Sequence, residues 1–116
     1  MTQLSLTTER DGPVVRLVLD GELDIASAGH VERELERIEQ EAPATLVLDL
    51  RKLTFMDSTG LRIIVSADAR ARERSRRFVL VRGPDAVQRI FRMTRLDERL
   101  TIVDDPAHAR AGAETR

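Results

Sequence analysis

The sequence contains no cysteine, no tryptophan and no tyrosine, and its only aromatic residues are three phenylalanines. Without cysteine the chain forms no disulfide and no thiolate metal site. Its core therefore has to be packed from Leu, Val, Ile and Ala. No apolar run approaches the roughly 18 residues that a membrane-spanning helix needs, and no basic and apolar leader pattern opens the sequence. We expect a cytoplasmic protein that does not insert into a membrane.

An excess of one charge is also missing. The 19 basic and 20 acidic residues give a formal net charge of −1 at pH 7, so nothing draws the whole protein toward nucleic acid or anionic lipid. The one basic cluster, five arginines between positions 70 and 77, has no interleaved aromatic residue to stack on bases. Cations at the C-terminal end of a helix also complement the helix dipole. We interpret the cluster as a solvated helix end and predict no nucleic-acid partner.

Groups that carry out chemistry are scarce. His30 and His108 stand alone, with no metal-ligand spacing around either. No potential nucleophile can be paired with a general base in the sequence. No glycine-rich loop followed by Lys-Ser/Thr is present to bind the phosphates of a nucleotide. We predict no metal, no cofactor, no catalytic residue and no enzymatic activity.

The spacing of apolar residues predicts the first elements. Residues 3–8 and 14–19 alternate apolar and polar side chains around a turn at 11–13, the pattern of an antiparallel hairpin. The period then changes to that of an amphipathic helix, with Ser27 as its N-cap and Pro43 just beyond its end. The apolar stripe of this helix consists of Ala28, Val31, Leu35 and Ile38.

The rest of the chain alternates strands with helices. These segments are a buried strand at 46–50, a helix at 58–76, a strand at 78–81, a helix opening at 83–85, a strand at 100–103 and a helical turn after Pro106. The order ββαβαβαβα predicts one α/β domain, with an N-terminal antiparallel hairpin, a mostly parallel sheet and helices packed on it. We assign residues 1–110 to the domain and residues 111–116 to a frayed C-terminal tail.

Residues 55–61, Phe-Met-Asp-Ser-Thr-Gly-Leu, join the buried strand to the following helix. In an open parallel sheet the loops at the carboxyl ends of the strands form the usual binding edge, and residues 22–27 and 82–85 belong to the same edge. As a purely structural feature the segment is a good helix start, with Asp57 or Ser58 as its cap.

Two details favour a function for this segment. Met56 is predicted to be exposed in the turn. Gly60 makes the helix less stable than alanine would, by about 1 kcal/mol. A glycine at this position is explained if another backbone approaches it closely. A phosphate on Ser58 would add about −1.5 to −2 charges beside Asp57, which a helix start tolerates but a desolvated interface does not. From the residues alone, a phosphorylation switch and a simple helix start remain open alternatives.

The segment LVLDLRKLTFMDSTGLRIIVSA resembles the signature of the STAS domain, specifically of the bacterial anti-sigma factor antagonists. VVRLVLDGELDIASA and VRGPDAVQRIFRMTRLDERLTIVDD resemble other parts of the same family, in the same order. The resemblance implies that Ser58 is phosphorylated by a partner anti-sigma factor with serine kinase activity. It implies that the unphosphorylated protein binds this partner and frees a sigma factor, and that a serine phosphatase resets the switch.

The resemblance and the segment together give a set of predicted partner-binding residues. They are Asp24, Ser27, Met56, Asp57, Ser58, Thr59, Gly60 and Arg62. Thr59 stands where a second serine is commoner in the family and is a less favoured phosphate acceptor. Arg62 stands where many members carry a small residue, and its long cation can pair with Asp57 or with the phosphate. The alternative function is a scaffold or lipid-transport-associated STAS module that docks without phosphorylation.

Overall fold

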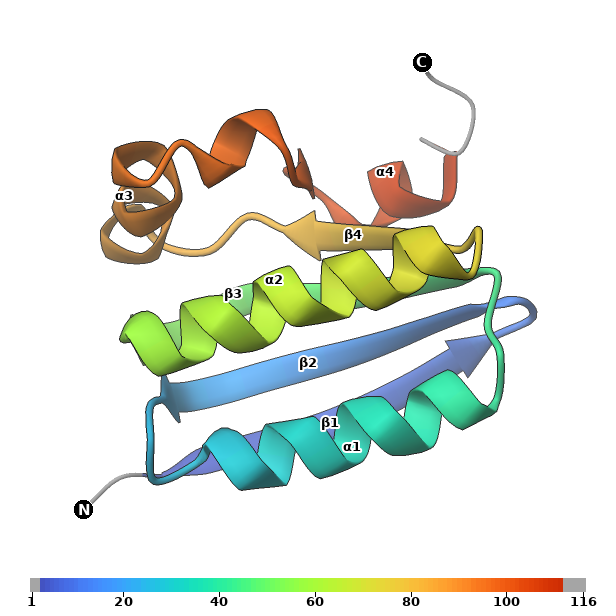
Figure 1. The fold of residues 1–116 in the computed structure, drawn as a ribbon, viewed down its shortest axis with the longest axis horizontal. Helices are drawn as coiled ribbons and strands as arrows, with labels where there is room; N and C mark the ends of the chain where they lie inside the picture. The colour runs from blue at the N-terminus through green and yellow to red at the C-terminus, as the bar shows by residue number, and fades with distance from the viewer. Residues whose placement is uncertain (1–2, 112–116) are drawn as a thin grey trace.

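The described part of the chain contains five β-strands, which form one mixed sheet, and helices pack against both of its faces (Figure 1). The structure is a computed structural model that describes residues 3–111. In chain order the elements are β1 (Leu4–Asp11), β2 (Val14–Leu23), α1 (Ala28–Gln40), β3 (Thr45–Met56), α2 (Ser58–Glu73), β4 (Arg77–Val81), α3 (Asp85–Met93), the 3-10 turn η1 (Leu96–Glu98), β5 (Thr101–Val103) and α4 (Pro106–Ala111). The predicted ββαβαβαβα order is confirmed, with η1 as an addition. The division at residue 110 stays a prediction, and residues 112–116 of the predicted tail lie outside the described range.

The strands follow one another across the sheet in the order β1-β2-β3-β4-β5. β1 and β2 pair antiparallel, and the other three pairs are parallel, as the sequence predicts. α1 and α2 lie side by side on one face of the sheet (Figure 1). Ala109 of α4 packs with Val47, Val79 and Val81, whose neighbours along the strands face α1 and α2, so α4 covers part of the opposite face.

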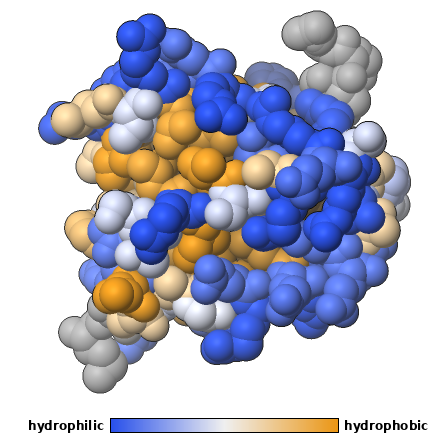
Figure 2. All heavy atoms as spheres, viewed as in Figure 1, coloured by the Kyte–Doolittle hydropathy of each residue, from blue (hydrophilic) through white to orange (hydrophobic). Residues whose placement is uncertain are grey.

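The main core lies between the sheet and α1, α2 and α3. α1 buries the four residues of its predicted apolar stripe. α2 contributes Ile63, Ile64 and Ala67, and α3 contributes Val87 and Phe91. Most of these core side chains are aliphatic, and their close packing against the sheet fills the core with few aromatic residues. On the surface in this view, hydrophobic residues gather between α2 and α3, whereas hydrophilic residues cover α1 and the C-terminal half of α2 (Figure 2).

The second half of β3 departs from simple alternation. Two register shifts between β2 and β3 each give β3 one extra residue, as in a β-bulge. Because each extra residue turns the following side chain to the other face, Leu50, Leu53 and Met56 all point into the same core although they are three positions apart. Met56 is 3% exposed. The prediction that Met56 is exposed is therefore wrong.

α2 ends at Glu73, three residues before the predicted end. Ser75 adopts the left-handed conformation, with φ of 57°. The Arg76 N–H donates to the Ala71 carbonyl at 2.8 Å and the Ser75 N–H to the Arg72 carbonyl at 3.1 Å, which closes the helix as a Schellman motif. No helix among the described residues has the length and apolar character to cross a membrane.

Candidate functional site

The carboxyl ends of β2, β3 and β4 meet at one edge of the sheet, and both α1 and α2 begin there (Figure 1). The Asp57 N–H donates to the Leu23 carbonyl at 3.2 Å, which ties the end of β3 to the end of β2. The segment 55–61 and the loop 24–27 are therefore neighbours, as the sequence predicts.

Asp57 is the N-cap of α2. Its Oδ1 accepts the Thr59 N–H at 2.9 Å and the Gly60 N–H at 3.3 Å, and its backbone is extended, with φ of −108° and ψ of −171°. Its carbonyl accepts the Leu61 N–H at 3.1 Å. The sequence left the cap open between Asp57 and Ser58, and the structure assigns it to Asp57. The first turn of α2 thus does not depend on the Ser58 hydroxyl.

Ser58 is the first residue of α2 and its side chain is exposed. Within residues 3–111 its hydroxyl makes no hydrogen bond. Thr59 is half-buried, and Arg62, one helical turn further on, is exposed. The pairing of Arg62 with Asp57 that the sequence allowed is not formed. The Ser58 hydroxyl is therefore accessible as a nucleophile and makes no structural hydrogen bond within residues 3–111.

Gly60 lies on the buried side of this exposed turn. A Cβ built on it would lie 2.7 Å from Leu23 Cγ and 2.8 Å from Met56 Cγ. The expectation that another backbone approaches Gly60 is wrong, because side chains of β2 and β3 fill that space. Met56 and Gly60 lie beneath the site and shape it from below.

The loop between β2 and α1 is held by its own polar side chains. Asp24 Oδ1 accepts the Ala26 N–H at 3.0 Å and the Ser27 N–H at 3.2 Å. The Ser27 hydroxyl donates to the Glu22 carbonyl at 2.8 Å and accepts the Asp24 N–H at 3.0 Å. Ser27 holds the N-cap position of α1 without a side-chain capping bond, and it is 8% exposed. Its hydroxyl fixes the loop.

Sequence reasoning missed two exposed apolar residues at this edge. Ile25, in the loop after β2, is 79% exposed, and Phe55, near the end of β3, is 48% exposed. Phe55 pairs with Glu22 across the two strands. The sequence does offer one signal for Ile25, because a single isoleucine in an otherwise polar loop is often exposed. The second register shift decides that Phe55 faces solvent, and nothing in the sequence marks that shift.

Comparison with known proteins identifies the family. The family model of the STAS domain matches residues 5–109. The chain belongs to the STAS-domain family. A relative named anti-sigma-B factor antagonist, from Listeria monocytogenes, is 33% identical over 94 residues, which cover 81% of this chain and 82% of the relative. The relationship thus extends over most of both chains.

Solved structures show the same fold for this STAS domain. An anti-sigma factor antagonist from Mycobacterium paratuberculosis superposes with a TM-score of 0.86 at 23% identity, over 95% of this chain and 93% of the other. The antagonist SpoIIAA in its unphosphorylated form gives a TM-score of 0.77 at 21% identity, over 97% and 100% of the two chains. The phosphorylated form of Bacillus SpoIIAA gives 0.73 at 20% identity, over 95% and 100%.

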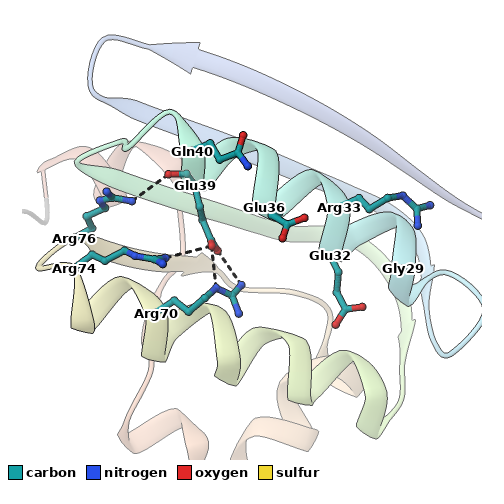
Figure 3. Close-up of a pocket in the computed structure, with 9 residues that line it drawn as sticks. All are labelled: Gly29, Glu32, Arg33, Glu36, Glu39, Gln40, Arg70, Arg74 and Arg76. Carbon is teal, nitrogen blue, oxygen red and sulfur yellow. Dashed lines mark hydrogen bonds and ion pairs between the residues drawn. The ribbon is translucent and has the colours of Figure 1, made fainter.

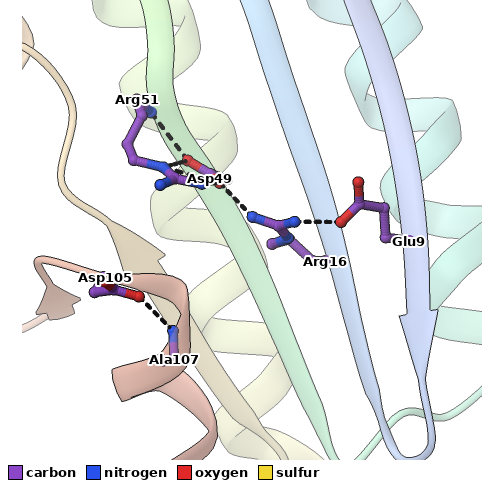
Figure 4. A network of polar contacts seen from close by, with 6 residues as sticks. All are labelled: Glu9, Arg16, Asp49, Arg51, Asp105 and Ala107. Carbon is purple, nitrogen blue, oxygen red and sulfur yellow. Dashed lines mark hydrogen bonds and ion pairs between the residues drawn. The ribbon is translucent and has the colours of Figure 1, made fainter.

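An ion network centred on one buried carboxylate lies on the face of the STAS domain opposite α1 and α2 (Figure 4). Asp49, 1% exposed, accepts hydrogen bonds from Arg16 Nη1 at 2.9 Å and from Arg51 Nη2 at 2.8 Å, and Arg16 also contacts Glu9. Burial opposes ionisation of this carboxyl, but the hydrogen bonds and positive charge of Arg51, together with the charge of Arg16, hold the pKa of Asp49 below its ordinary value. The network joins β1, β2 and β3.

Three arginines of the basic cluster, Arg70, Arg74 and Arg76, line an open groove of about 730 Å³ between α1 and α2 of the STAS domain (Figure 3). Glu39 accepts two hydrogen bonds from Arg70, each of 2.9 Å, and lies 3.7 Å from Arg74. Arg76 donates to the Glu39 carbonyl at 3.2 Å. These contacts join the ends of the two helices, so Arg70, Arg74 and Arg76 have a structural role.

Proposed function

We propose that this STAS domain is an anti-sigma factor antagonist that is controlled by phosphorylation of Ser58. With Ser58 unmodified it binds an anti-sigma factor that has serine kinase activity, and a sigma factor is freed. The relatives named as anti-sigma factor antagonists support this role. The observation that carries the proposal is the exposed Ser58 hydroxyl, which has no hydrogen bond within residues 3–111, while the neighbouring Asp57 caps the helix.

The chemistry is a phosphoryl transfer in which this protein is the substrate. Ser58 Oγ attacks the γ-phosphorus of an ATP held by the kinase, and an Oγ–P bond forms as the bond to the β,γ-bridging oxygen breaks. ADP leaves, and the hydroxyl proton passes to a base of the kinase. A serine phosphatase restores the hydroxyl by adding water across the Oγ–P bond. The protein supplies a positioned nucleophile and no other catalytic group.

A phosphate at this position switches binding through desolvation. It adds about −1.5 to −2 charges next to Asp57. Covering an unpaired charge of this size costs several kcal/mol, enough to lower affinity by about two decades or more. The fold is spared because the first turn of α2 is capped by Asp57.

We infer that the predicted partner-binding residues divide into two groups. The solvent-facing group meets the partner and consists of Asp24, Asp57, Ser58, Thr59 and Arg62, with Ile25 and Phe55 as apolar anchors. The second group, Ser27, Met56 and Gly60, is buried and holds the first group in place. Exposed apolar side chains at a binding edge are suited to the dry centre of an interface.

Incubation with candidate anti-sigma kinases and ATP, followed by peptide mass spectrometry, tests the proposal. We expect one phosphate, on Ser58, in the wild type and in Thr59→Ala, and none in Ser58→Ala. Phosphate found only at other positions would defeat the proposal. A constitutive scaffold or lipid-transport module would carry no phosphate and would bind its partner equally well as Ser58→Ala and Ser58→Asp.

A further inference from the structure

The backbone N–H groups of residues 59–61, at the start of α2, are already occupied. The Thr59 and Gly60 N–H groups donate to Asp57 Oδ1 at 2.9 and 3.3 Å, and the Leu61 N–H donates to the Asp57 carbonyl at 3.1 Å. A phosphate on Ser58 therefore meets engaged amides and, on the preceding residue, a carboxylate. We therefore expect its compensating positive charge to come from a side chain.

Arg62 is placed to supply that charge. It follows Ser58 by four positions on α2, the spacing at which two side chains share one face of a helix with Cβ atoms about 5–6 Å apart. Long side chains on a helix lean toward its N-terminus, which directs the guanidinium toward the turn of Ser58. Arg62 is exposed and has no hydrogen bond or ion pair within the described residues. An anion that precedes a cation by four residues is also the more favourable order.

The other charges at this edge make Arg62 the natural partner of a phosphate. Glu22, Asp24 and Asp57 add negative charge at the ends of β2 and β3. On the neighbouring β4–α3 loop, Arg82 is already paired with Asp104 at 2.8 Å. Arg62, in contrast, has no partner among the described residues and lies one turn beyond Ser58 on the same helix.

We propose that the Arg62 guanidinium binds the phosphate of phosphorylated Ser58 within the same helix. The inference rests on the proposed function in one respect, that Ser58 is the modified residue. Phosphorylation then changes the docking surface in two ways. It adds a dianion, of which one arginine offsets only part of the charge, and it removes a free cation from the surface. The planar fork of arginine can hold two phosphate oxygens at once, which a lysine cannot reproduce.

Phosphorus NMR on protein with phosphoserine incorporated at position 58 during translation tests the pairing without any kinase. A titration between about pH 4 and 8 follows the second ionisation of the phosphate, whose pKa is ordinarily near 6. We expect this pKa to be about 0.3 units higher in Arg62→Ala than in the wild type, because the cation favours the dianion. Arg62→Lys should fall between the two.

Arg33→Ala is the matched control, since Arg33 is an exposed arginine of α1 and its loss changes the net charge equally. It should leave the phosphate pKa at the wild-type value. Coincident titration curves for the wild type and Arg62→Ala would overturn the pairing, and so would an equal shift in Arg33→Ala. If no kinase modifies Ser58, the proposed function fails while this pKa difference still stands or falls by itself.

Discussion

Gly60 faces Leu23 so closely that a Cβ on Gly60 would lie 2.7 Å from Leu23 Cγ. This contact sets the first turn of α2 against β2, directly below Ser58. We predict that Gly60→Ala destabilises the protein by about 1–3 kcal/mol, because overpacking outweighs the gain of about 1 kcal/mol in helix propensity. Urea unfolding measures this. Gly29→Ala in α1 is the control, since its Cβ would meet only the flexible end of Arg33, at 3.3 Å. An equal effect of both substitutions would contradict the packing argument.

The division of labour between Asp57 and Ser58 gives a second prediction. Asp57→Ala should lower the free energy of unfolding by about 0.5–2 kcal/mol, because two N–H groups lose their acceptor. Ser58→Ala should change it by less than about 0.5 kcal/mol, as expected for an exposed side chain without partners. Urea denaturation of the two variants provides the comparison. A larger loss in Ser58→Ala would mean that the hydroxyl has a structural role.

The Asp49 network predicts a pH dependence of stability. Because the pKa of Asp49 is lowered in the folded protein, its ionised form stabilises the fold above the unfolded pKa of about 3.9. That contribution is lost as the pH falls through the lower, folded pKa. Asp49→Asn should therefore be less stable than the wild type by about 1–3 kcal/mol at pH 7. The difference in the free energy of unfolding between the wild type and Asp49→Asn should become smaller below about pH 4. Urea unfolding at several pH values measures it. A stability difference that does not change with pH would show that the charge of Asp49 is not its cause.

The exposed apolar side chains at the Ser58 edge give a prediction about binding. Ile25→Ser and Phe55→Ser should each weaken binding of the anti-sigma partner by roughly tenfold or more, as measured by titration calorimetry, because an apolar anchor is lost. Ile25→Val, which keeps an apolar side chain, should retain most of the affinity. Thermal unfolding checks that the fold is intact. Unchanged affinity in both serine variants would place the interface elsewhere.

The order of elements was predictable because local patterns and long-range packing agree over most of the chain. The apolar stripe of α1 has the helical period, and all four of its residues are buried as expected. The end of α2 was not predictable, because a serine, Ser75, takes the left-handed position that glycine usually marks.

The site was predictable in position but not in detail. Asp57 and Ser58 follow a buried strand and open a helix, which places them at the carboxyl edge of the sheet. The burial of Met56 and the exposure of Phe55 depend on two register shifts between β2 and β3. Such shifts arise from pairing between strands distant in sequence, so the pattern of β3 alone does not reveal them.

Titration calorimetry of the purified protein with its anti-sigma kinase, with and without phosphate on Ser58, shows whether the phosphate controls docking. We predict that phosphorylation raises the Kd by about a hundredfold or more and hardly changes the unfolding midpoint. Ser58→Ala should keep the low Kd when kinase and ATP are present. Equal Kd values for the phosphorylated and unphosphorylated forms would contradict control of docking by the phosphate.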